Sequence, residues 1–231
     1  MSFPSPIKAL LDTNIWPSTV THNWIPFPQT LTWGSHSVRM DVVVPVPRLL
    51  RNKTQDESNA IYESLKQIAE MSNNGRLIPY QSDEITIERL YRRHPGLRGT
   101  EFDVFSGITC EHARAPIMRG FTITPAYSRQ RATEDWNNFL AKIRHPRFLE
   151  LKKETGGNHC ADLYHLWEAE HNGLDCFITL DVRFINGTTN LIDLQRLPKS
   201  RREALPALGT NLGQKSSFFC ELRPVSPKQF T

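Results

Sequence analysis

The sequence predicts an α/β fold built around a mostly parallel sheet, and three short apolar runs support that prediction. Residues 7–11 form the first run, which stops at the polar turn formers Asp12-Thr13-Asn14, as a buried strand would. Similar runs occur at residues 77–80 and 176–180, and each follows a segment with apolar side chains at helical spacing. Such alternation is typical of parallel strands joined by helices.

The helices are predicted at residues 54–71, from residue 82 or 83 to about residue 91, at 133–143 and at 161–171. In the first of them, Ile61, Leu65 and Ile68 form an apolar stripe, and Asn73-Asn74-Gly75 is typical of a helix end. Ser82 or Asp83 can cap the second helix. Pro146 argues against a helix that continues past residue 143.

The segment from residue 16 to residue 47 has a different composition. Its five prolines argue against a long helix, while the three valines at 42–44 favour a strand that ends at Pro45. Trp24, Phe27 and Trp33 could stack on nucleobases, but aromatic side chains among prolines more often cover a core, and we expect that here.

The composition is that of one globular domain with a substantial core. The chain has 231 residues, 39% of them hydrophobic, and a formal net charge of +4, which permits binding to a polyanion without requiring it. None of the four cysteines forms a C-x-x-C pair, so the usual zinc and redox spacings are absent. Scattered thiols and the lack of a run of about 20 apolar residues predict a cytoplasmic protein with no membrane span.

Carboxylates follow two of the predicted strands at the point where each strand ends. Asp12 comes after the first strand and Asp181 after the strand at 176–180, so a parallel sheet would bring both to one edge. Asp162, 19 positions before Asp181, lies in the first turn of the intervening helix and can return to that edge. Taken singly, these residues could be a turn former, a helix-dipole partner and a strand terminator; their joint placement favours a site.

Carboxylates that converge in this way repel one another unless a cation lies between them. Oxygen ligands with neighbouring waters suit Mg²⁺ or Mn²⁺, and such an ion can activate water and orient a phosphodiester for in-line displacement. Asp12, Asp162 and Asp181 therefore predict a divalent-metal site that hydrolyses a phosphate ester.

Four segments of the chain share the pattern of one known family. They are LLDTN at residues 10–14, DLYHLWEAE at 162–170, CFITLDVRF at 176–184 and PVSPKQF at 224–230. Together they resemble the PIN-domain family of metal-dependent ribonucleases, which includes VapC-type toxins. The match covers about 30 residues near the two ends of the chain and is weak in the middle.

The resemblance implies a three-layer α/β/α sandwich with a mainly parallel central sheet. It implies one domain over residues 1–231, with insertions at about 17–47 and 92–150. Asp12, Asp162 and Asp181 would be the family's first, third and fourth acids, which hold one or two Mg²⁺ or Mn²⁺ ions and cleave RNA. Asn14 would brace the loop of Asp12, and Thr179 would form a hydrogen bond near the metal site.

The second acid of the family pattern falls on the helix that follows residues 77–80. We choose Glu88, which lies deeper in this helix, while Glu84, one turn earlier on the same face, is the alternative. Either residue could also be an ordinary solvated helix acid. The neighbouring Arg89, Arg92 and Arg93 form the basic group that we assign to substrate phosphates.

Three histidines, His159, His165 and His171, recur at intervals of six residues. Six residues rotate a helical position by about 240°, so the three rings do not share one face, and we do not expect them to bind zinc together. We treat them as ordinary helix or loop residues, with a peripheral role open to His159.

These patterns leave two functions to separate. The first is an endoribonuclease that uses Mg²⁺ or Mn²⁺ to cleave RNA. Toxins of toxin–antitoxin pairs are one class of such enzymes, and a toxin would have an antitoxin or another protein as its partner. The protein could also form a homodimer. The second is a non-catalytic PIN-like module that binds RNA or a protein. A DNA nuclease of the flap-endonuclease type is a third alternative.

Overall fold

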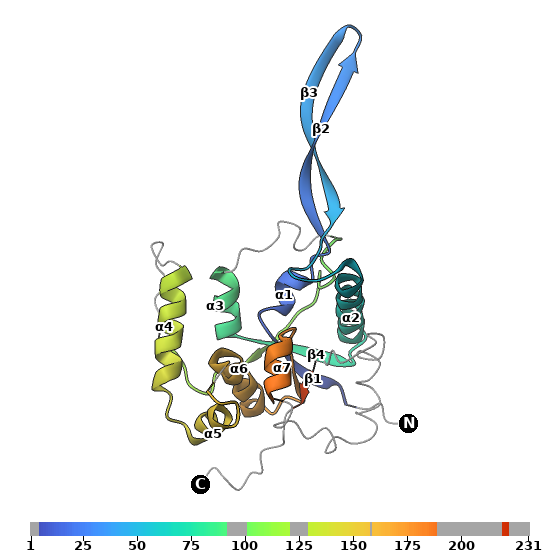
Figure 1. Ribbon diagram of the computed structural model, residues 1–231. Helices are drawn as coiled ribbons and strands as arrows, with labels where there is room; N and C mark the ends of the chain where they lie inside the picture. Colours follow the sequence, from blue (N-terminus) through green and yellow to red (C-terminus); the bar gives the residue numbers. More distant parts are fainter. Residues whose placement is uncertain (1–4, 92–100, 121–128, 158, 189–218, 222–231) are drawn as a thin grey trace.

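The protein has a mixed α/β architecture around one central sheet (Figure 1). The structure, a computed structural model, describes residues 5–91, 101–120, 129–157, 159–188 and 219–221. The strands of the central sheet are β5 (Glu111–Ala113), β4 (Leu77–Ser82), β1 (Ile7–Leu11), β6 (Cys176–Ile178) and β7 (Phe219–Glu221), in that spatial order. The first four run parallel and β7 is antiparallel to β6, so the predicted α/β class with a mostly parallel sheet is confirmed.

Helices flank this sheet. They are α1 (Ile15–Ser18), α2 (Gln55–Asn73), α3 (Asp83–Tyr91), α4 (Arg129–Lys142), α5 (Pro146–Glu154), α6 (Cys160–His171) and α7 (Val182–Thr188). In the view of Figure 1, α2 lies on one side of the body, and α4 and α5 lie on the other. Within the described part of the chain, no helix has the length and apolar character that crossing a membrane requires.

The core surrounds β1, the middle strand of the sheet. Ala9, Leu10 and Leu11 are completely buried, so both faces of this strand are covered. The predicted stripe of α2 is buried as well, with Leu65 and Ile68 almost inaccessible to solvent. Because β1 is held rigidly on both faces, the residue that follows it, Asp12, has a fixed position.

Several predicted helix ends are shifted. α2 begins directly after Thr54, which forms a capping box with Glu57. α4 begins at Arg129 rather than at residue 133, so the predicted start is wrong by one turn. The predicted break at Pro146 is confirmed, because this residue opens a separate helix, α5, behind the cap residue His145.

The strand predicted at residues 176–180 is shorter than expected and ends at Ile178. It stops there because the backbone and side chains of the next three residues turn away to build the site described below. The predicted run at residues 191–194 and the family-like segment at 224–230 lie outside the described residues.

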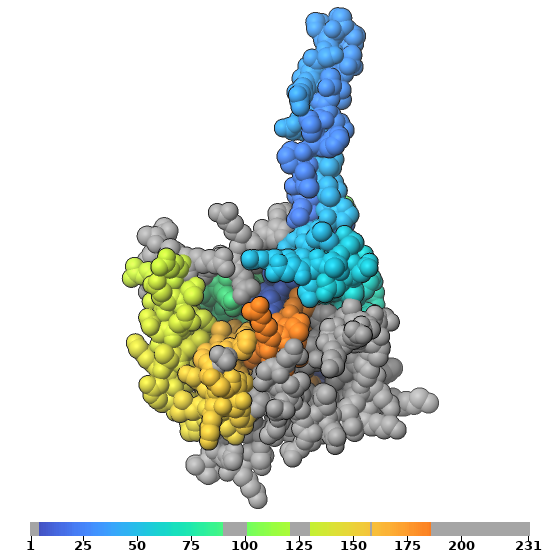
Figure 2. All heavy atoms as spheres, in the orientation of Figure 1, coloured from blue at the N-terminus to red at the C-terminus, as the bar shows by residue number. Residues whose placement is uncertain are grey.

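Residues 22–47 form a ribbon that projects from the body (Figures 1 and 2). Its strands are β2 (His22–Trp33) and β3 (His36–Pro47), which pair antiparallel over their whole length. The predicted strand end at Pro45 is therefore wrong. The expectation that the aromatic side chains of this segment cover a core is also wrong, since Trp24, Phe27 and Trp33 are 47%, 56% and 90% exposed.

Candidate metal centre

The strand order reverses between β1 and β6. From β1 the chain adds β4 and then β5 on one side, whereas β6 adds to the other side of β1. Open parallel sheets bind ligands at such a reversal, outside the carboxyl ends of the strands. Asp12 follows β1 there, and Asp181 lies three residues beyond the end of β6. The N–H of Asp12 donates to the carbonyl of Ile178 at 2.9 Å, which joins the two strand ends.

The carboxylate of Asp12 is buried and fully oriented by its neighbours. Its Oδ1 accepts from the N–H of Thr13, and its Oδ2 accepts from the hydroxyl of Thr179, each at 2.6 Å. Burial raises the pKa of Asp12, while the charge of His165 and the hydrogen bond from Thr179 act in the opposite direction. The carboxylate is thus held in one orientation at the strand end.

Thr179 and Asn14 tie together the two loops that leave the sheet. The side-chain amide of Asn14 donates to Thr179 Oγ1 at 3.0 Å, and its carbonyl oxygen accepts from the N–H of Leu180 at 3.0 Å. Thr179 Oγ1 also accepts from the N–H of Asp181 at 3.1 Å. The two residues expected to support the site therefore lie between Asp12 and Asp181, where they fix the separation of the two acids.

Three side chains form a group that could hold a metal ion: His159, Asp162 and Asp181. One ligand atom from each lies within 4.8 Å of the other two. His159 precedes α6 with a left-handed φ of 57°, and its Nδ1 lies 3.6 Å from Asp162 Oδ2. Asp181 caps α7, since its Oδ1 accepts from the N–H groups of residues 183 and 184. A nitrogen and two carboxylates are therefore gathered from two helix starts.

The protonation of Asp162 responds to this crowding. Burial is the largest cause that raises its pKa to about 7, and the negative charges of Asp12, Asp181 and Glu88 raise it further, while His165 lowers it. Asp12 stands outside the three-residue group, but its charge acts on Asp162. The predicted acids are thus electrostatically coupled, and their mutual repulsion is what a bound cation would relieve.

Of the two glutamates on α3, Glu88 faces this centre. Its Oε2 accepts from the hydroxyl of Thr13 at 2.6 Å and lies 3.8 Å from His165 Nε2. Glu84 instead forms a buried ion pair with Arg119, with 3.0 Å between Glu84 Oε2 and the Arg119 guanidinium. These contacts distinguish Glu88 from Glu84, which the helical pattern alone does not do.

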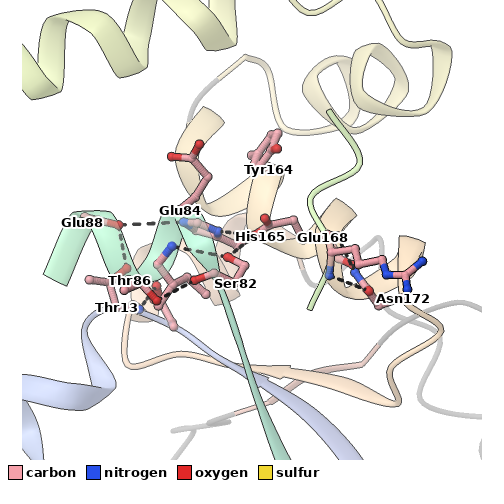
Figure 3. A network of polar contacts seen from close by, with 12 residues as sticks. Thr13, Ser82, Glu84, Thr86, Glu88, Tyr164, His165, Glu168 and Asn172 are labelled. Atoms are coloured by element: carbon pink, nitrogen blue, oxygen red, sulfur yellow. Dashed lines mark hydrogen bonds and ion pairs between the residues drawn. The ribbon is translucent and has the colours of Figure 1, made fainter. Parts of the chain in front are cut away.

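A buried polar chain lies behind the acids (Figure 3). It runs from Thr13 through Glu88 to His165, then to Glu168 and Ser82. His165 Nδ1 lies 2.8 Å from Glu168 Oε2, and Glu168 also accepts from the Ser82 hydroxyl at 2.9 Å. Burial lowers the pKa of His165, but its contacts with Glu168 and Glu88 outweigh that effect and raise the pKa well above its ordinary value. His165 therefore lies buried between two acids that favour its protonated form.

The arginines assigned to substrate binding are only partly described. The guanidinium of Arg89 stacks on the ring of Trp16, 3.8 Å from its centroid, and bonds to the side chain of Gln81. Arg92 and Arg93 lie outside the described residues. A pocket of about 250 Å³ opens beside Glu88, and the ring of Trp136 forms part of its wall.

Two of the histidines that were expected to be ordinary helix or loop residues belong to the site. His159 belongs to the possible metal group, and His165 lies at the middle of the buried chain. The sequence contained a usable pattern for the second: Asp162, His165 and Glu168 follow one another at intervals of three, which places them along one helix face. Comparing the histidines with the acids, and not only with each other, would have found it.

Comparisons of the chain with family models, with curated proteins and with solved structures gave no match.

Proposed function

We propose that the chain is a divalent-metal-dependent endoribonuclease with a PIN-like three-layer sandwich. The observation that supports this most is the gathering of His159, Asp162 and Asp181 at the switch point of a parallel sheet, with Asp12 and Glu88 close by. The four motif segments that resemble PIN domains support the same function. RNA is the proposed substrate.

The donor set fits a divalent cation. His159, Asp162 and Asp181 would hold it; the pKa of Asp162 is raised first by burial and further by the charges of Asp12, Asp181 and Glu88, and a bound cation would offset both effects. Of Mg²⁺ and Mn²⁺, the imidazole favours Mn²⁺, because Mg²⁺ prefers oxygen ligands alone. When bound, such an ion supplies an activated water and stabilises charge on a phosphodiester.

The chain's own residues would orient the reactants. Thr179 and Thr13 fix the two oxygens of Asp12, and Thr13 also positions Glu88 at the mouth of the pocket beside Trp136. Glu88 is one-third exposed, so its carboxylate can reach a substrate or an ordered water. Glu88 Oε2 is held on its interior side by the Thr13 hydroxyl at 2.6 Å and by His165 Nε2 at 3.8 Å, and its side chain forms part of the pocket wall.

Removing one acid tests the proposal. With Mn²⁺ and single-stranded RNA, Asp12→Asn and Asp181→Asn should each slow cleavage by about a hundredfold or more, since the loss of a residue that only supports a metal ligand already costs about 10- to 100-fold. Asp56→Asn, an exposed change in the first turn of α2, should cleave like wild type, and a chelator should stop wild-type cleavage. Equal cleavage by wild type and both site variants would exclude the nuclease. Mn²⁺ binding without cleavage would favour the non-catalytic PIN-like module.

Metal affinity should depend on pH through Asp162. Its carboxyl, with a pKa of about 7, must lose a proton before it can bind a cation. Mn²⁺ affinity should therefore rise about tenfold per pH unit from about pH 5 to pH 7 and change little above pH 8. Calorimetric titration in buffers of different ionisation enthalpy measures both the affinity and the released proton. An affinity that stays constant across pH 6 to 7 would contradict this assignment.

A further inference from the structure

The β2–β3 ribbon has one face on which nine of the twelve side chains are apolar. Side chains alternate along each strand, and paired residues share a face. We call this the apolar ribbon face; its apolar members are Ile25, Phe27, Leu31 and Trp33 of β2 with Val38, Met40, Val42, Val44 and Val46 of β3, and its polar members are Asn23, Gln29 and His36. The opposite face carries four prolines, Trp24 and Val43 together with His22, Thr30, Thr32, Ser37 and the charged pair Arg39 and Asp41.

The apolar ribbon face is open to solvent in a single copy of the chain. Phe27, Leu31 and Val38 are more than half exposed, and Trp33 at the tip is 90% exposed. Figure 2 shows the ribbon standing away from the body, with no described element packed along it. The face presents on the order of 700 Å² of apolar surface, more than monomeric proteins ordinarily leave uncovered.

The base of the ribbon is attached through its opposite face. The rings of His22 and Trp24 pack on Phe102, with centroids 4.4 and 6.3 Å apart. The N–H of Thr21 donates to the carbonyl of Phe102 at 2.9 Å, and the N–H of Arg48 donates to the carbonyl of Thr21 at 2.8 Å. The two rings belong to the face opposite the apolar ribbon face, so the ribbon is attached without covering that face.

Prolines limit what the ribbon's edges can bind. Trp33 and His36 flank a two-residue turn in which Gly34 has a φ of +60°. The two residues that flank such a turn form a hydrogen-bonded pair, and hydrogen-bonded pairs then recur at every second position of the ladder. By that alternation, the four prolines of the ribbon, at positions 26, 28, 45 and 47, occupy sites whose backbone nitrogen points outward. They fit the ladder and remove two outward-pointing donors from each edge, which opposes addition of another strand there. A binding partner is therefore expected to contact the apolar ribbon face and not the edges of the ribbon.

The charge of the ribbon indicates which kind of partner fits. Arg39 and Asp41 cancel, and both lie on the other face, so the apolar ribbon face has no positive charge for a phosphate backbone. We propose that this face packs against the same face of a second copy of the chain. About 700 Å² from each copy approaches the roughly 800 Å² per partner of a standard interface, and identical apolar faces are self-complementary under two-fold symmetry. Two ribbons stacked face to face would form a small β-sandwich.

Matched substitutions on the two faces test the dimer. Leu31→Glu puts a charge on the apolar ribbon face, whereas Thr30→Glu puts the same charge on the opposite face, one residue away. In sedimentation equilibrium, wild type and Thr30→Glu should have twice the chain mass of 26.6 kDa, and Leu31→Glu should have the single-chain mass. The dissociation constant should rise at least about a hundredfold in Leu31→Glu, because a buried, unpaired charge is costly.

Other outcomes would overturn the proposal. These are a wild-type protein that stays monomeric at the highest attainable concentration, a Leu31→Glu variant that remains dimeric, and dimers lost equally in both variants. Circular dichroism spectra recorded well below the melting temperature should match among all three proteins, since residue 31 lies outside the core. Should Leu31→Glu fail that check, Trp33→Ser at the tip of the ribbon serves as the second variant and must give the same loss of dimer.

Discussion

Replacing Asp162 with Asn is expected to abolish metal binding and, at the same time, to stabilise the metal-free protein above about pH 7. The side chain of Asp162 is 22% exposed, and burial together with Asp12, Asp181 and Glu88 raises its pKa to about 7. Between about pH 4 and pH 7 the folded state keeps a proton that the unfolded state has lost. The free energy of unfolding of the wild type therefore falls as pH rises through this window and stays low above it.

Asparagine removes that charge while keeping the size of the side chain. Above pH 7 the gain should be on the order of 2 to 4 kcal/mol, because each pKa unit corresponds to about 1.4 kcal/mol. Urea unfolding with a chelator at pH 5 and pH 8 measures it, and the difference from wild type should be much larger at pH 8. Added Mn²⁺ should stabilise wild type and leave Asp162→Asn unchanged. A variant less stable than wild type at pH 8 without metal would show that Asp162 is a structural residue.

Replacing Glu168 with Ala should destabilise the fold on the order of 3 to 5 kcal/mol, the cost of breaking a buried ion pair. Glu168 is completely buried, lies 2.8 Å from His165 Nδ1 and accepts from the Ser82 hydroxyl. Its loss would leave a buried imidazolium with Glu88 as its remaining acidic contact in the polar chain. Glu168→Gln is the matched control: it keeps the volume and the acceptor for Ser82, so it should cost less than Ala.

The pH dependence separates this pair from Asp162. The folded pKa of His165 is raised well above its ordinary value, so its contribution is fully present below about pH 6.5 and is lost as pH rises through the raised value. The gap between wild type and Glu168→Ala should therefore be widest in mildly acidic solution and narrow in alkaline solution. Equal stability of wild type and Glu168→Ala near pH 6 would contradict the buried pair.

Local patterns in the sequence were sufficient to place β1 and to place the acids that follow β1 and β6, although the end of β6 itself was placed two residues too late. β1 and the position of Asp12 follow from a run of five residues, four of them apolar, before a turn former, and Asp181 follows from a similar pattern near the other end of the chain. The helix before β6 places Asp162 in its first turn, as predicted. Each of these features depends on residues within about ten positions of one another, which is the range over which hydrophobic periodicity is informative.

Features that depend on distant partners were not predicted. Helical phase puts Glu84 and Glu88 on one face, and the difference between them comes from Arg119, 35 residues away, and from Thr13, 75 residues away. The ribbon was not predicted because proline normally interrupts a strand. Only the pairing register shows that the backbone nitrogens of these prolines point outward, where they do not disturb the ladder.

The hydrogen bond between Asn14 and Thr179 limits when, during synthesis of the chain, the metal centre can form. These residues are 165 positions apart, and their contact joins the loops after β1 and β6. During synthesis, most of the chain must therefore emerge from the ribosome before the loop after β1, with Asp12, can pack against the loop that carries Asp181. Closing so long a loop costs only slowly increasing entropy, so assembly is delayed and not prevented. Nascent chains that end before β6 should fold in part and lack an assembled centre, so the proposed nuclease would stay inactive until its synthesis is nearly complete.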